Sequence, residues 1–457
     1  MNNFEEEKFN INFEYLEKST IAIIGLGYVG LPLALEFDKT KINVSNKKKL
    51  SRKIIGFDID SKRIDELNKG FDKTQEIESV ELKKIRNLKF TKDANYLKNV
   101  DVFVVCVPTP IDEYKNPDLY ALKESSSLVG RSIRKRLQIS KFPKPIVIFE
   151  STVYPGCTEE ICIPIIEKAG GIKLNEDFYC GYSPERINPG DSDRKINNIV
   201  KVTSGSCKEA SLIVDKLYSS IIEAGTFKAK SIKVAEAAKV IENTQRDINI
   251  ALINELALIF NRLNISTKDV LEAASTKWNF INFKPGLVGG HCIGVDPYYL
   301  AYKSKSLGYY PEIILSGRRI NDGMSDYIVE QFIFNLMRIS FNPNENSVLI
   351  LGVSFKENCP DYRNSLVIDI INKLKGYNLK IEIVDPYVNQ KEILVKHNIC
   401  VMKSIDKNSK YKAILVCVAH DIFKNYSLEC WQNLIKDNSF IYDVKGIVPD
   451  NLKPIRL

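Results

Sequence analysis

Cys292 stands in a segment whose residue types favour nucleophilic chemistry. Residues 284–300 read KPGLVGGHCIGVDPYYL. The pair Gly289-Gly290 lets the backbone approach a neighbouring group just before the thiol, and Asp296-Pro297 is typical of the start of a helix. A thiol on a tight loop beside a helix N-terminus is expected to have a lowered pKa and to react as the thiolate. We therefore predict that Cys292 is a nucleophile.

The alternative for Cys292 is a buried structural cysteine, which is the commoner fate of this residue type. The neighbouring His291 is interpreted as a structural histidine and not as the base.

A polar stripe on a predicted helix supplies partners for such a nucleophile. Ser231–Leu263 contains neither proline nor glycine and predicts one long helix. Lys239, Asn243 and Arg246 are spaced by four and three residues, so they share one face, and Asn254 continues it. An ammonium group there would suit a developing oxyanion. The alternative is a solvated helix edge.

The glycines of Ile21–Gly30, which reads IAIIGLGYVG, predict a dinucleotide-binding loop. The sequence has the form G-x-G-x-x-G between a predicted strand and a predicted helix. Gly25 permits the tight turn, Gly27 lets the pyrophosphate approach the backbone, and Gly30 lets the helix pack on the strand. The helix N-terminus then offers amide donors to the phosphates.

An acidic residue ends the second predicted strand, in IIGFDID, and selects the cofactor. Asp58 is expected to bind both ribose hydroxyls and to repel a 2′-phosphate, so NAD is favoured over NADP. It lies further from the glycines than usual because the basic run 39–53 intervenes as an inserted loop. Arg63 follows and is expected near the adenine or ribose.

Two further segments follow predicted strands and are expected to line a ligand site at the carboxyl edge of the sheet. They are Glu150–Gly156 (ESTVYPG) and Ser183–Gly190 (SPERINPG), which carries Glu185 and Arg186. Near the C-terminus, SFKENCPDYRNS places Lys356 and Arg363 in another such loop. Together these cations are consistent with a diphosphate site between two sheets; the alternative for each is a surface salt bridge.

The elements that must position these residues form an α/β pattern. Strand-like runs at 21–25, 53–58, 101–107, 146–150 and 178–181 alternate with helical segments and predict a doubly wound parallel sheet. A second alternating region contains SVLILG, KIEIVDP, AILVCVAH and FIYDV. We expect two Rossmann-like domains joined by a helical central domain. The predicted divisions are an arm (1–18), an NAD-binding domain (19–215), a central helical domain (216–340) and a C-terminal α/β domain (341–457).

Composition narrows the class of protein. Apart from the basic run 39–53, the basic residues are spread along the chain, and the net charge of +8 fits an enzyme with anionic ligands equally well, so no nucleic-acid partner is predicted. No apolar run is long enough for a membrane helix, and the acidic start lacks a secretory pattern, so a cytoplasmic enzyme is expected. The ten cysteines are then expected as thiols, and with only three histidines no metal site is predicted.

Taken together, these motifs make the chain resemble the UDP-glucose/GDP-mannose dehydrogenase family from about residue 19 to 450. The matching segments are GLGYVGLPLA, VPTP, ESTVYPG, SPERINPGD, AEAAKVIENTQRDINIALINE, GLVGGHCIGVDPYYL and SFKENCPDYRNS. Several resemble the branch that acts on N-acetylated UDP-hexosamines. The resemblance implies oxidation of the C6 alcohol of such a sugar to a carboxylate by two NAD, and a homodimer formed through the long helix.

The resemblance also implies residue roles. Catalysis is carried over to Cys292 as the thiohemiacetal and thioester nucleophile, with Lys239, Asn243, Asp296 and Glu185 in support. Cofactor positions are Gly25, Gly27, Val29, Gly30, Asp58, Arg63, Thr109, Thr152 and Arg363. Substrate positions are Arg186, Ile187, Lys239, Asn243, Arg246, Gly289, Phe355, Lys356 and Lys445.

The chain departs from the family pattern at two places, and the second of them bears on the substrate. The 39–53 insertion is long, and 277–282 lacks the arginine with which other members contact a partner chain's sugar. The substrate expected first is UDP-N-acetylglucosamine; UDP-N-acetylmannosamine and UDP-glucose are alternatives. A single-step hydroxy-acid dehydrogenase would share the cofactor loop but needs no nucleophile, and a nucleotide sensor would lack Cys292 or Lys239.

Overall fold

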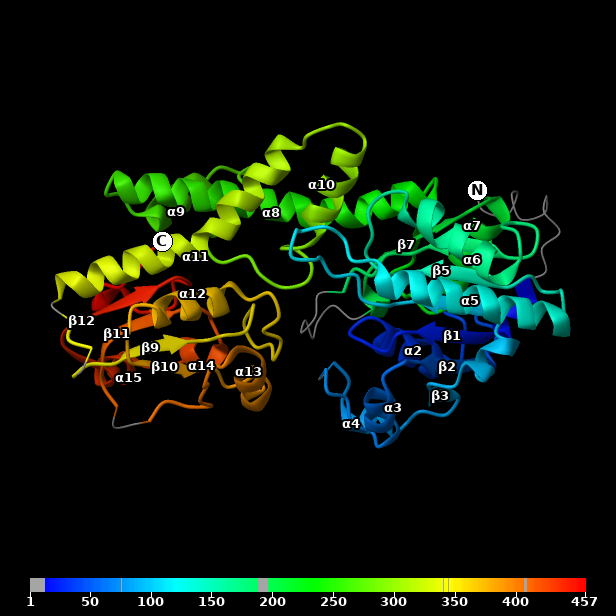
Figure 1. Ribbon diagram of the computed structural model, residues 1–457, viewed down its shortest axis with the longest axis horizontal. Helices are drawn as coiled ribbons and strands as arrows, with labels where there is room; N and C mark the ends of the chain where they lie inside the picture. The colour runs from blue at the N-terminus through cyan, green and yellow to red at the C-terminus, as the bar shows by residue number, and fades with distance from the viewer. Residues whose placement is uncertain (1–12, 75, 188–195, 340, 344, 407–408) are drawn as a thin grey trace. The chain divides into compact units, whose positions relative to one another are not determined.

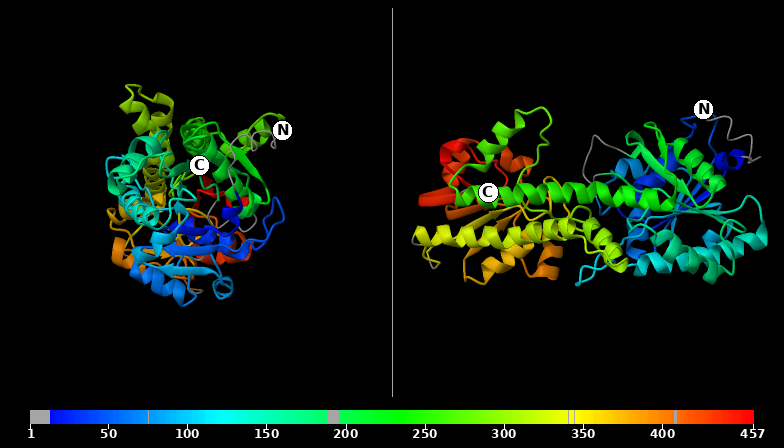
Figure 2. Two further views of the ribbon diagram at one scale, coloured as in Figure 1. Left: turned by 90° about the vertical axis from the view of Figure 1, so that its right-hand side faces the viewer. Right: turned by 90° about the horizontal axis from the view of Figure 1, so that it is seen from above.

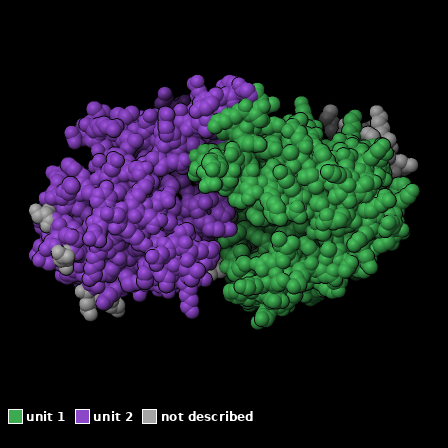
Figure 3. Space-filling model, in the orientation of Figure 1, with its two compact units in different colours: residues 1–242, 298–307 green, residues 243–297, 308–457 purple. Residues whose placement is uncertain are grey.

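The computed structural model describes residues 13–74, 76–187, 196–339, 341–343, 345–406 and 409–457. The chain separates into two compact units, shown in Figure 3. Unit 1 comprises residues 1–242 and 298–307, and unit 2 comprises 243–297 and 308–457. The unit boundary runs through two helices, α8 (Ile232–Arg262) and α10 (Asp296–Ser306). It therefore groups the chain differently from the predicted three-domain division, which stays a prediction.

Unit 1 is built on an eight-stranded sheet in the order β3-β2-β1-β4-β5-β6-β7-β8 (Figure 1). All neighbouring strands are parallel except β6 and β7. The first six follow the dinucleotide-binding order 3-2-1-4-5-6, in which ligands bind beyond the carboxyl ends of the strands. The strands are β1 (Thr20–Ile24), β2 (Lys53–Phe57), β3 (Leu88–Thr91), β4 (Val102–Val105), β5 (Ile146–Phe149), β6 (Tyr179–Tyr182), β7 (Lys201–Gly205) and β8 (Thr226–Lys228).

The central strands of this sheet, β1, β4 and β5, are apolar on both faces, as a parallel sheet covered on both sides requires. Ile21 and Ile23 of β1 and their neighbours pack into a core with helices α2 (Gly30–Lys39) and α7 (Lys208–Ser219). The remaining helical elements of this unit are η1 (Phe13–Glu17), α3 (Ser61–Asn68), α4 (Ser79–Leu82), η2 (Ala94–Asn99), α5 (Tyr120–Ile139), η3 (Thr158–Cys162), α6 (Ile163–Gly170) and η4 (Ile196–Asn198). Helices α5 and α6 pack against one another.

The predicted long helix is confirmed as α8, which is continuous over 31 residues (Figure 2). In unit 2 it is followed by α9 (Thr267–Ser275) and α11 (Glu312–Arg338). Between α9 and α10, residues 276–295 form neither helix nor strand. Loops of this length inside a compact domain are uncommon and usually functional.

Unit 2 also contains a five-stranded parallel sheet in the order β10-β9-β11-β12-β13. This is the second common doubly wound order, 2-1-3-4-5. Successive residues of β9 face opposite cores: Val348 and Ile350 pack with α11 and α12, and Leu349 and Leu351 with α14 and α15. The elements are β9 (Val348–Leu351), α12 (Leu366–Lys375), β10 (Ile381–Val384), α13 (Gln390–His397), β11 (Tyr411–Val416), α14 (Asp421–Lys424), α15 (Leu428–Leu434), β12 (Ile435–Asp443), η5 (Asp450–Leu452) and β13 (Ile455–Arg456).

The predicted fold class is confirmed: two doubly wound parallel sheets with a helical region between them in sequence. The predicted arm falls partly outside the described residues, at 1–12. Its remainder forms η1, whose Leu16 is 3% exposed and belongs to the core of unit 1. All ten cysteines lie in the described part and none is in a disulfide. Among the described helices, none combines the length and apolarity needed to cross a membrane.

Of the basic run 39–53, which was predicted as an inserted loop, residues 40–52 form a loop between α2 and β2, while Lys39 ends α2 and Lys53 begins β2. The loop is held in place locally. The Asn43 N–H donates to Lys48 O across the turn, and the Val44 N–H donates to Ser220 O. The buried Arg52 side chain donates to Leu16 O at 2.8 Å. Lys48 lies within 4 Å of Glu17. Several charges of the run therefore stabilise the fold around η1.

Candidate active site

The glycine-rich loop has the geometry that its spacing predicts. Gly25 follows β1 with φ +93°, and a Cβ there would lie 2.8 Å from Cys106 O. A Cβ on Gly30 would lie 1.9 Å from Gly25 O, so the first turn of α2 packs directly on the loop. Gly27, by contrast, has no atom within 4 Å of an added Cβ. The middle glycine therefore leaves its backbone open, as approach of a pyrophosphate requires. Val29 is the half-buried N-cap residue of α2.

Asp58 lies directly after β2 and is joined to this loop. Its Oδ2 accepts the Leu26 N–H at 2.9 Å and its Oδ1 accepts the Asp60 N–H at 2.9 Å. The side chain is half-buried, which leaves it accessible to ribose hydroxyls. Arg63 is 3% exposed; it donates to Leu26 O at 2.9 Å and pairs with Asp72 at 2.8 Å. Both of these contacts are with the protein itself, so the Arg63 side chain supports the glycine-rich loop from within the fold. These glycines and Asp58 fit an NAD, with the phosphates at the loop and the ribose at the acid.

Two predicted threonines meet at the carboxyl edge of the same sheet. Thr109 follows β4 and Thr152 follows β5, and the Thr109 hydroxyl donates to Thr152 O at 2.7 Å. Tyr299 of α10 is fully buried and donates to Thr109 O at 2.5 Å. The two loops are thus fixed to each other beside the cofactor loop.

Glu185 belongs to a buried charged cluster that was not predicted. Its Oε1 accepts the N–H groups of Arg186 and Ile187, both at 2.7 Å, and its Oε2 accepts from Lys201 at 3.0 Å. Lys201 also pairs with Glu150 at 2.9 Å. Burial opposes the charge on Lys201, but the two carboxylates outweigh it and raise the pKa of this lysine. Glu185 is therefore an oriented carboxylate held by an ammonium group.

The same cluster includes Tyr218, whose hydroxyl donates to Glu150. The pKa of Glu150 is raised, because the effect of its burial outweighs the opposite effect of the Lys201 ammonium group. A lysine inside the apolar run IVKVTSG was the available signal for this cluster, because a lone charge in a buried strand needs a buried partner. The Arg186 guanidinium pairs with Glu242 of α8 at 2.8 Å. Glu242 is the last residue of the first segment of unit 1.

Along α8 the predicted polar stripe is buried at three of its four positions, and Asn254 is the most deeply buried of them. Lys239 is 7% exposed and Asn243, one turn further, is 8% exposed, whereas Arg246 is exposed. One turn before Lys239, the fully buried Glu236 accepts the N–H groups of Gly156 at 2.5 Å and Thr158 at 2.9 Å. Burial raises the pKa of Glu236 to about 7. Glu236 thus joins α8 to the segment 150–156.

The Cys292 loop is fixed within unit 2. Asn243 donates to Asp296 Oδ2 at 2.6 Å, at the start of α10. Just before α10, the backbone carbonyl of Cys292 accepts the N–H groups of Val295 at 3.1 Å and Asp296 at 2.9 Å. The thiol residue is half-buried. Burial and the neighbouring Arg363 lower the pKa of His291, so that its neutral form is favoured.

The glycine pair before Cys292 packs on the loop after β9. A Cβ on Gly290, whose φ is +86°, would lie 2.7 Å from Phe355 Cδ2. A Cβ on Gly289 would lie 2.7 Å from Asn364 O and 3.4 Å from Phe355 Cβ. Phe355 and Gly289, both predicted substrate positions, are therefore brought together. Lys445 lies near Gly286, with its Nζ 4.0 Å from the position of a Cβ there. Burial lowers the pKa of Lys445.

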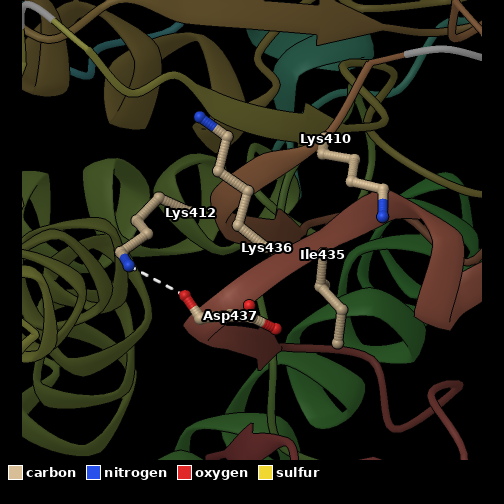
Figure 4. A pocket seen from close by; sticks show the side chains of 5 residues that line it. All are labelled: Lys410, Lys412, Ile435, Lys436 and Asp437. Carbon is tan, nitrogen blue, oxygen red and sulfur yellow. Dashed lines mark hydrogen bonds between the residues drawn. The ribbon is translucent and has the colours of Figure 1, made fainter.

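Two further predicted positions in unit 2 are less enclosed. Lys356 follows Phe355 on the same loop and is half-buried. Arg363, a predicted cofactor contact, pairs with Asp361 at 2.7 Å and is more than a third exposed. A separate hollow at the amino-terminal ends of β11 and β12 is lined by Lys410, Lys412, Ile435, Lys436 and Asp437 (Figure 4). It contains none of the predicted site residues.

Two groups of predicted residues therefore emerge, one in each unit. Unit 1 contributes Gly25, Gly27, Val29, Gly30, Asp58, Arg63, Thr109, Thr152, Glu185, Arg186, Ile187 and Lys239. Unit 2 contributes Asn243, Arg246, Gly289, Cys292, Asp296, Phe355, Lys356, Arg363 and Lys445. A dinucleotide loop on a 3-2-1-4-5-6 sheet defines a dehydrogenase-type nucleotide-binding protein.

Comparison with known families identifies the class. Residues 19–222, 233–323 and 349–450 match the NAD binding, central and UDP binding domains of the UDP-glucose/GDP-mannose dehydrogenase family. The chain is 51% identical over 442 residues to UDP-N-acetyl-D-glucosamine 6-dehydrogenase of Salmonella typhi, covering 97% of this chain and 99% of that one. It is 50% identical to the Pseudomonas aeruginosa enzyme of the same name, covering 96% and 99%.

Among solved structures, UDP-D-ManNAc dehydrogenase from Pyrococcus horikoshii is similar, with a TM-score of 0.80 and 29% identity over 94% of this chain and 96% of that one. The chain belongs to the UDP-glucose/GDP-mannose dehydrogenase family. It is an NAD-dependent oxidoreductase that acts on a UDP-sugar, and the predictions of enzyme class and of NAD are confirmed.

Proposed function

We propose that this enzyme oxidises the C6 hydroxyl of UDP-N-acetylglucosamine to the carboxylate, with Cys292 as the covalent nucleophile. The observation that carries the substrate is the 51% and 50% identity, over nearly the whole chain, to two UDP-N-acetyl-D-glucosamine 6-dehydrogenases. The product would serve as a polysaccharide precursor. We also propose a cytoplasmic homodimer.

The proposed reaction consumes one water and two NAD for each sugar. Loss of a hydride and a proton from the C6 alcohol gives the aldehyde, and the Cys292 thiol adds to that carbon to give a thiohemiacetal. Loss of a second hydride and proton gives a thioester. Water then cleaves the C–S bond, which releases the carboxylate and restores the thiol. NAD supplies the hydride acceptor for both oxidations.

Residues of this chain take the remaining roles. Lys239 and Asn243, one turn apart on α8, supply an ammonium group and an amide for the developing oxyanion. Asp296 holds the Asn243 amide. Glu185, fixed by Lys201, orients the water together with Thr152. We assign Arg186, Ile187, Arg246, Gly289, Phe355, Lys356 and Lys445 to the substrate, and Val29, Thr109 and Arg363 with the glycine loop to NAD.

UDP-N-acetyl-D-mannosamine is the second candidate substrate, because enzymes of that name are 30% identical to this chain over 94% of its length. A panel of UDP-glucose and the UDP-linked N-acetyl derivatives of glucosamine, galactosamine and mannosamine, incubated with NAD, distinguishes them. Fastest NADH formation with UDP-N-acetylglucosamine is expected. No turnover of any N-acetylhexosamine would overturn the substrate class.

The covalent role is tested by counting NADH per sugar. Cys292→Ser is expected to lose the full oxidation by a factor on the order of 100 or more, because a hydroxyl is a far weaker nucleophile than a thiolate. The matched control is Cys400→Ser, since Cys400 is an exposed cysteine of the same unit. A Cys292→Ser enzyme that still forms two NADH per sugar would contradict the thioester.

A further inference from the structure

The long loop that carries Cys292 is anchored at Gly286, six residues before the thiol. Asn254, on α8, is fully buried and grips Gly286 at both of its backbone polar groups. The Gly286 N–H donates to Asn254 Oδ1 at 2.7 Å, and Asn254 Nδ2 donates to Gly286 O at 3.0 Å. Gly286 has φ +151°, in a stretch without regular structure, so this side chain replaces the partners that a strand or helix would give it.

A buried relay determines which way the Asn254 amide points. Asp247 accepts from Arg318 at 2.5 Å and from Asn321 Nδ2 at 2.7 Å. A carboxylate only accepts, so Asn321 must turn its amino group to Asp247 and its oxygen to Asn254. Asn254 Nδ2 donates to that oxygen at 2.8 Å. The Asn254 oxygen is left facing the Gly286 N–H.

Two more anchors lie on either side of the thiol. The Gly290 N–H donates to Asn364 O, and Asn364 Nδ2 donates to Gly290 O, both at 3.3 Å. Asn243 holds Asp296 at 2.6 Å. The loop from 286 to 296 is therefore fixed at three points, and the anchors at Gly286 and Asp296 come from one face of α8, since positions 243, 247 and 254 are spaced by close to whole turns.

We propose that Asn254 is a positioning residue for Cys292, acting through Gly286 and oriented by the Asp247–Asn321 relay. This inference rests on the proposed nucleophilic role of Cys292 for its catalytic consequence. The effect of Asn254 on the reactivity of the Cys292 thiol can be measured without any substrate.

Asn254→Ala removes both bonds to Gly286, and Asn254→Asp keeps the size and one acceptor but cannot donate to Gly286 O or to Asn321. The matched control is Asn249→Ala, because Asn249 lies on the same helix and donates to Gln245 O of that helix at 2.7 Å. Thermal unfolding of each variant establishes that it is folded at the assay temperature, and Asn254→Asp provides the test if Asn254→Ala is not.

The first readout is alkylation of the intact protein by iodoacetamide, followed by mass spectrometry of each cysteine peptide. Cys400 is exposed and serves as the internal reference. In the Asn254 variants the rate at Cys292 relative to Cys400 is expected to fall at pH 7 by roughly threefold or more, with its pH midpoint moved upward, because the thiolate loses its fixed place beside the start of α10. The Asn249 control is expected to match the wild type.

The second readout is steady-state turnover. The Asn254 variants are expected to lose kcat by roughly 10- to 100-fold while the KM values for NAD and for the UDP-sugar stay within about threefold, because the thiol attack is impaired and not ground-state binding. Unchanged Cys292 alkylation and unchanged kcat in a folded Asn254 variant would overturn the positioning role. Full two-NADH turnover by Cys292→Ser would instead overturn the proposed function. In that case the alkylation rates alone would show whether Asn254 positions Cys292.

Discussion

The two parallel sheets use the same device at the end of their first strand. Gly25 follows β1 with φ +93° and Gly352 follows β9 with φ +87°. Each donates its N–H at 2.8 Å to the last residue of the adjacent second strand, Phe57 or Val384. An aspartate then follows that second strand and accepts from the glycine loop: Asp58 from Leu26 at 2.9 Å, and Asp385 from Val353 at 2.7 Å.

The two aspartates differ in how much of the carboxylate remains available to a ligand. Asp58 is half-buried and accepts two N–H groups, Leu26 and Asp60. Asp385 is fully buried; it accepts four N–H groups, from Val353, Ser354, Tyr387 and Val388, and a proton-bearing nitrogen of His420 at 3.1 Å. The acid of the first sheet can therefore still bind a ribose, whereas the acid of the second is wholly used to hold its own loop.

His420 explains how the second loop is held at its other end. Its Nδ1 accepts the Asn358 N–H at 3.0 Å, so in the neutral ring the proton is on Nε2, which faces Asp385. Asp385 and His420 together fix residues 353–358, which carry Phe355 and Lys356. The same strand-end position thus leaves an acid available for a cofactor in one sheet and supplies internal support in the other, where the UDP binding domain lies.

The largest expected effect separates the two acids by stability. Asp385→Ala should lower the free energy of unfolding by about 3–5 kcal/mol, because it leaves His420 and several buried N–H groups without their acceptor. Asp58→Ala should cost about 1 kcal/mol, since its donors can bond to water. Urea unfolding monitored by circular dichroism measures both. Equal losses would remove the distinction drawn between the two sheets.

The second comparison uses the two glycines. A Cβ on Gly352 would lie 2.3 Å from the buried Val418 Cβ, whereas one on Gly25 would lie 2.8 Å from a carbonyl oxygen. Both positions have positive φ, so Gly352→Ala should cost about 3 kcal/mol and Gly25→Ala about 2 kcal/mol. Only Gly25→Ala should weaken NAD binding, measured by fluorescence titration. Loss of NAD binding in Gly352→Ala at a temperature where it is folded would contradict the assignment.

Local features of both sheets were predictable from sequence. Glycine spacing, a hydrophobic run and an acid after the next strand identify the first loop, and the absence of proline and glycine over residues 231–263 identifies α8. The strands β3, β7 and β8 were missed because their apolar signal is weak: β3 and β8 are partly exposed, and β7 reads KVTSG, in which Val202 is the one large apolar side chain.

Partners distant in the chain were not predictable. Lys201 and Glu150 are 51 residues apart, and Asp385 and His420 are 35 apart. Each sequence segment shows a charge in or beside an apolar run, which indicates that a partner must exist but does not name it. For the same reason Asn254 could be placed on a polar stripe but not against Gly286. The pairing is a property of the packed fold and of no local pattern.

The third prediction concerns pH. Burial would raise the pKa of Asp385, but the hydrogen bond from His420 and those from the backbone N–H groups outweigh it and lower the pKa to about 2. A lowered carboxyl pKa stabilises the folded state above the ordinary value of 3.8, and this stability is lost as the pH falls through 2.

The stability difference between the wild type and Asp385→Asn should therefore shrink by about 2 kcal/mol between pH 5 and pH 2. Urea unfolding at four or five pH values measures it, and the variant itself is the control because it cannot titrate at this position. A difference that is independent of pH would show that Asp385 is not held as the carboxylate.

The smallest expected effect tests the acid that remains available. Asp58→Asn keeps the acceptor for Leu26 but removes the charge and one acceptor for a ribose, so the Kd for NAD should rise by roughly tenfold, or about 1.4 kcal/mol. The same change removes the repulsion of a 2′-phosphate, so the Kd for NADP should fall or stay constant. Calorimetric titration of both cofactors gives the ratio, and Asp385→Asn, assayed where it is folded, is the control because its acid faces only its own loop. An unchanged NAD-to-NADP ratio in Asp58→Asn would show that the acid of the first sheet, like that of the second, serves only to hold the chain.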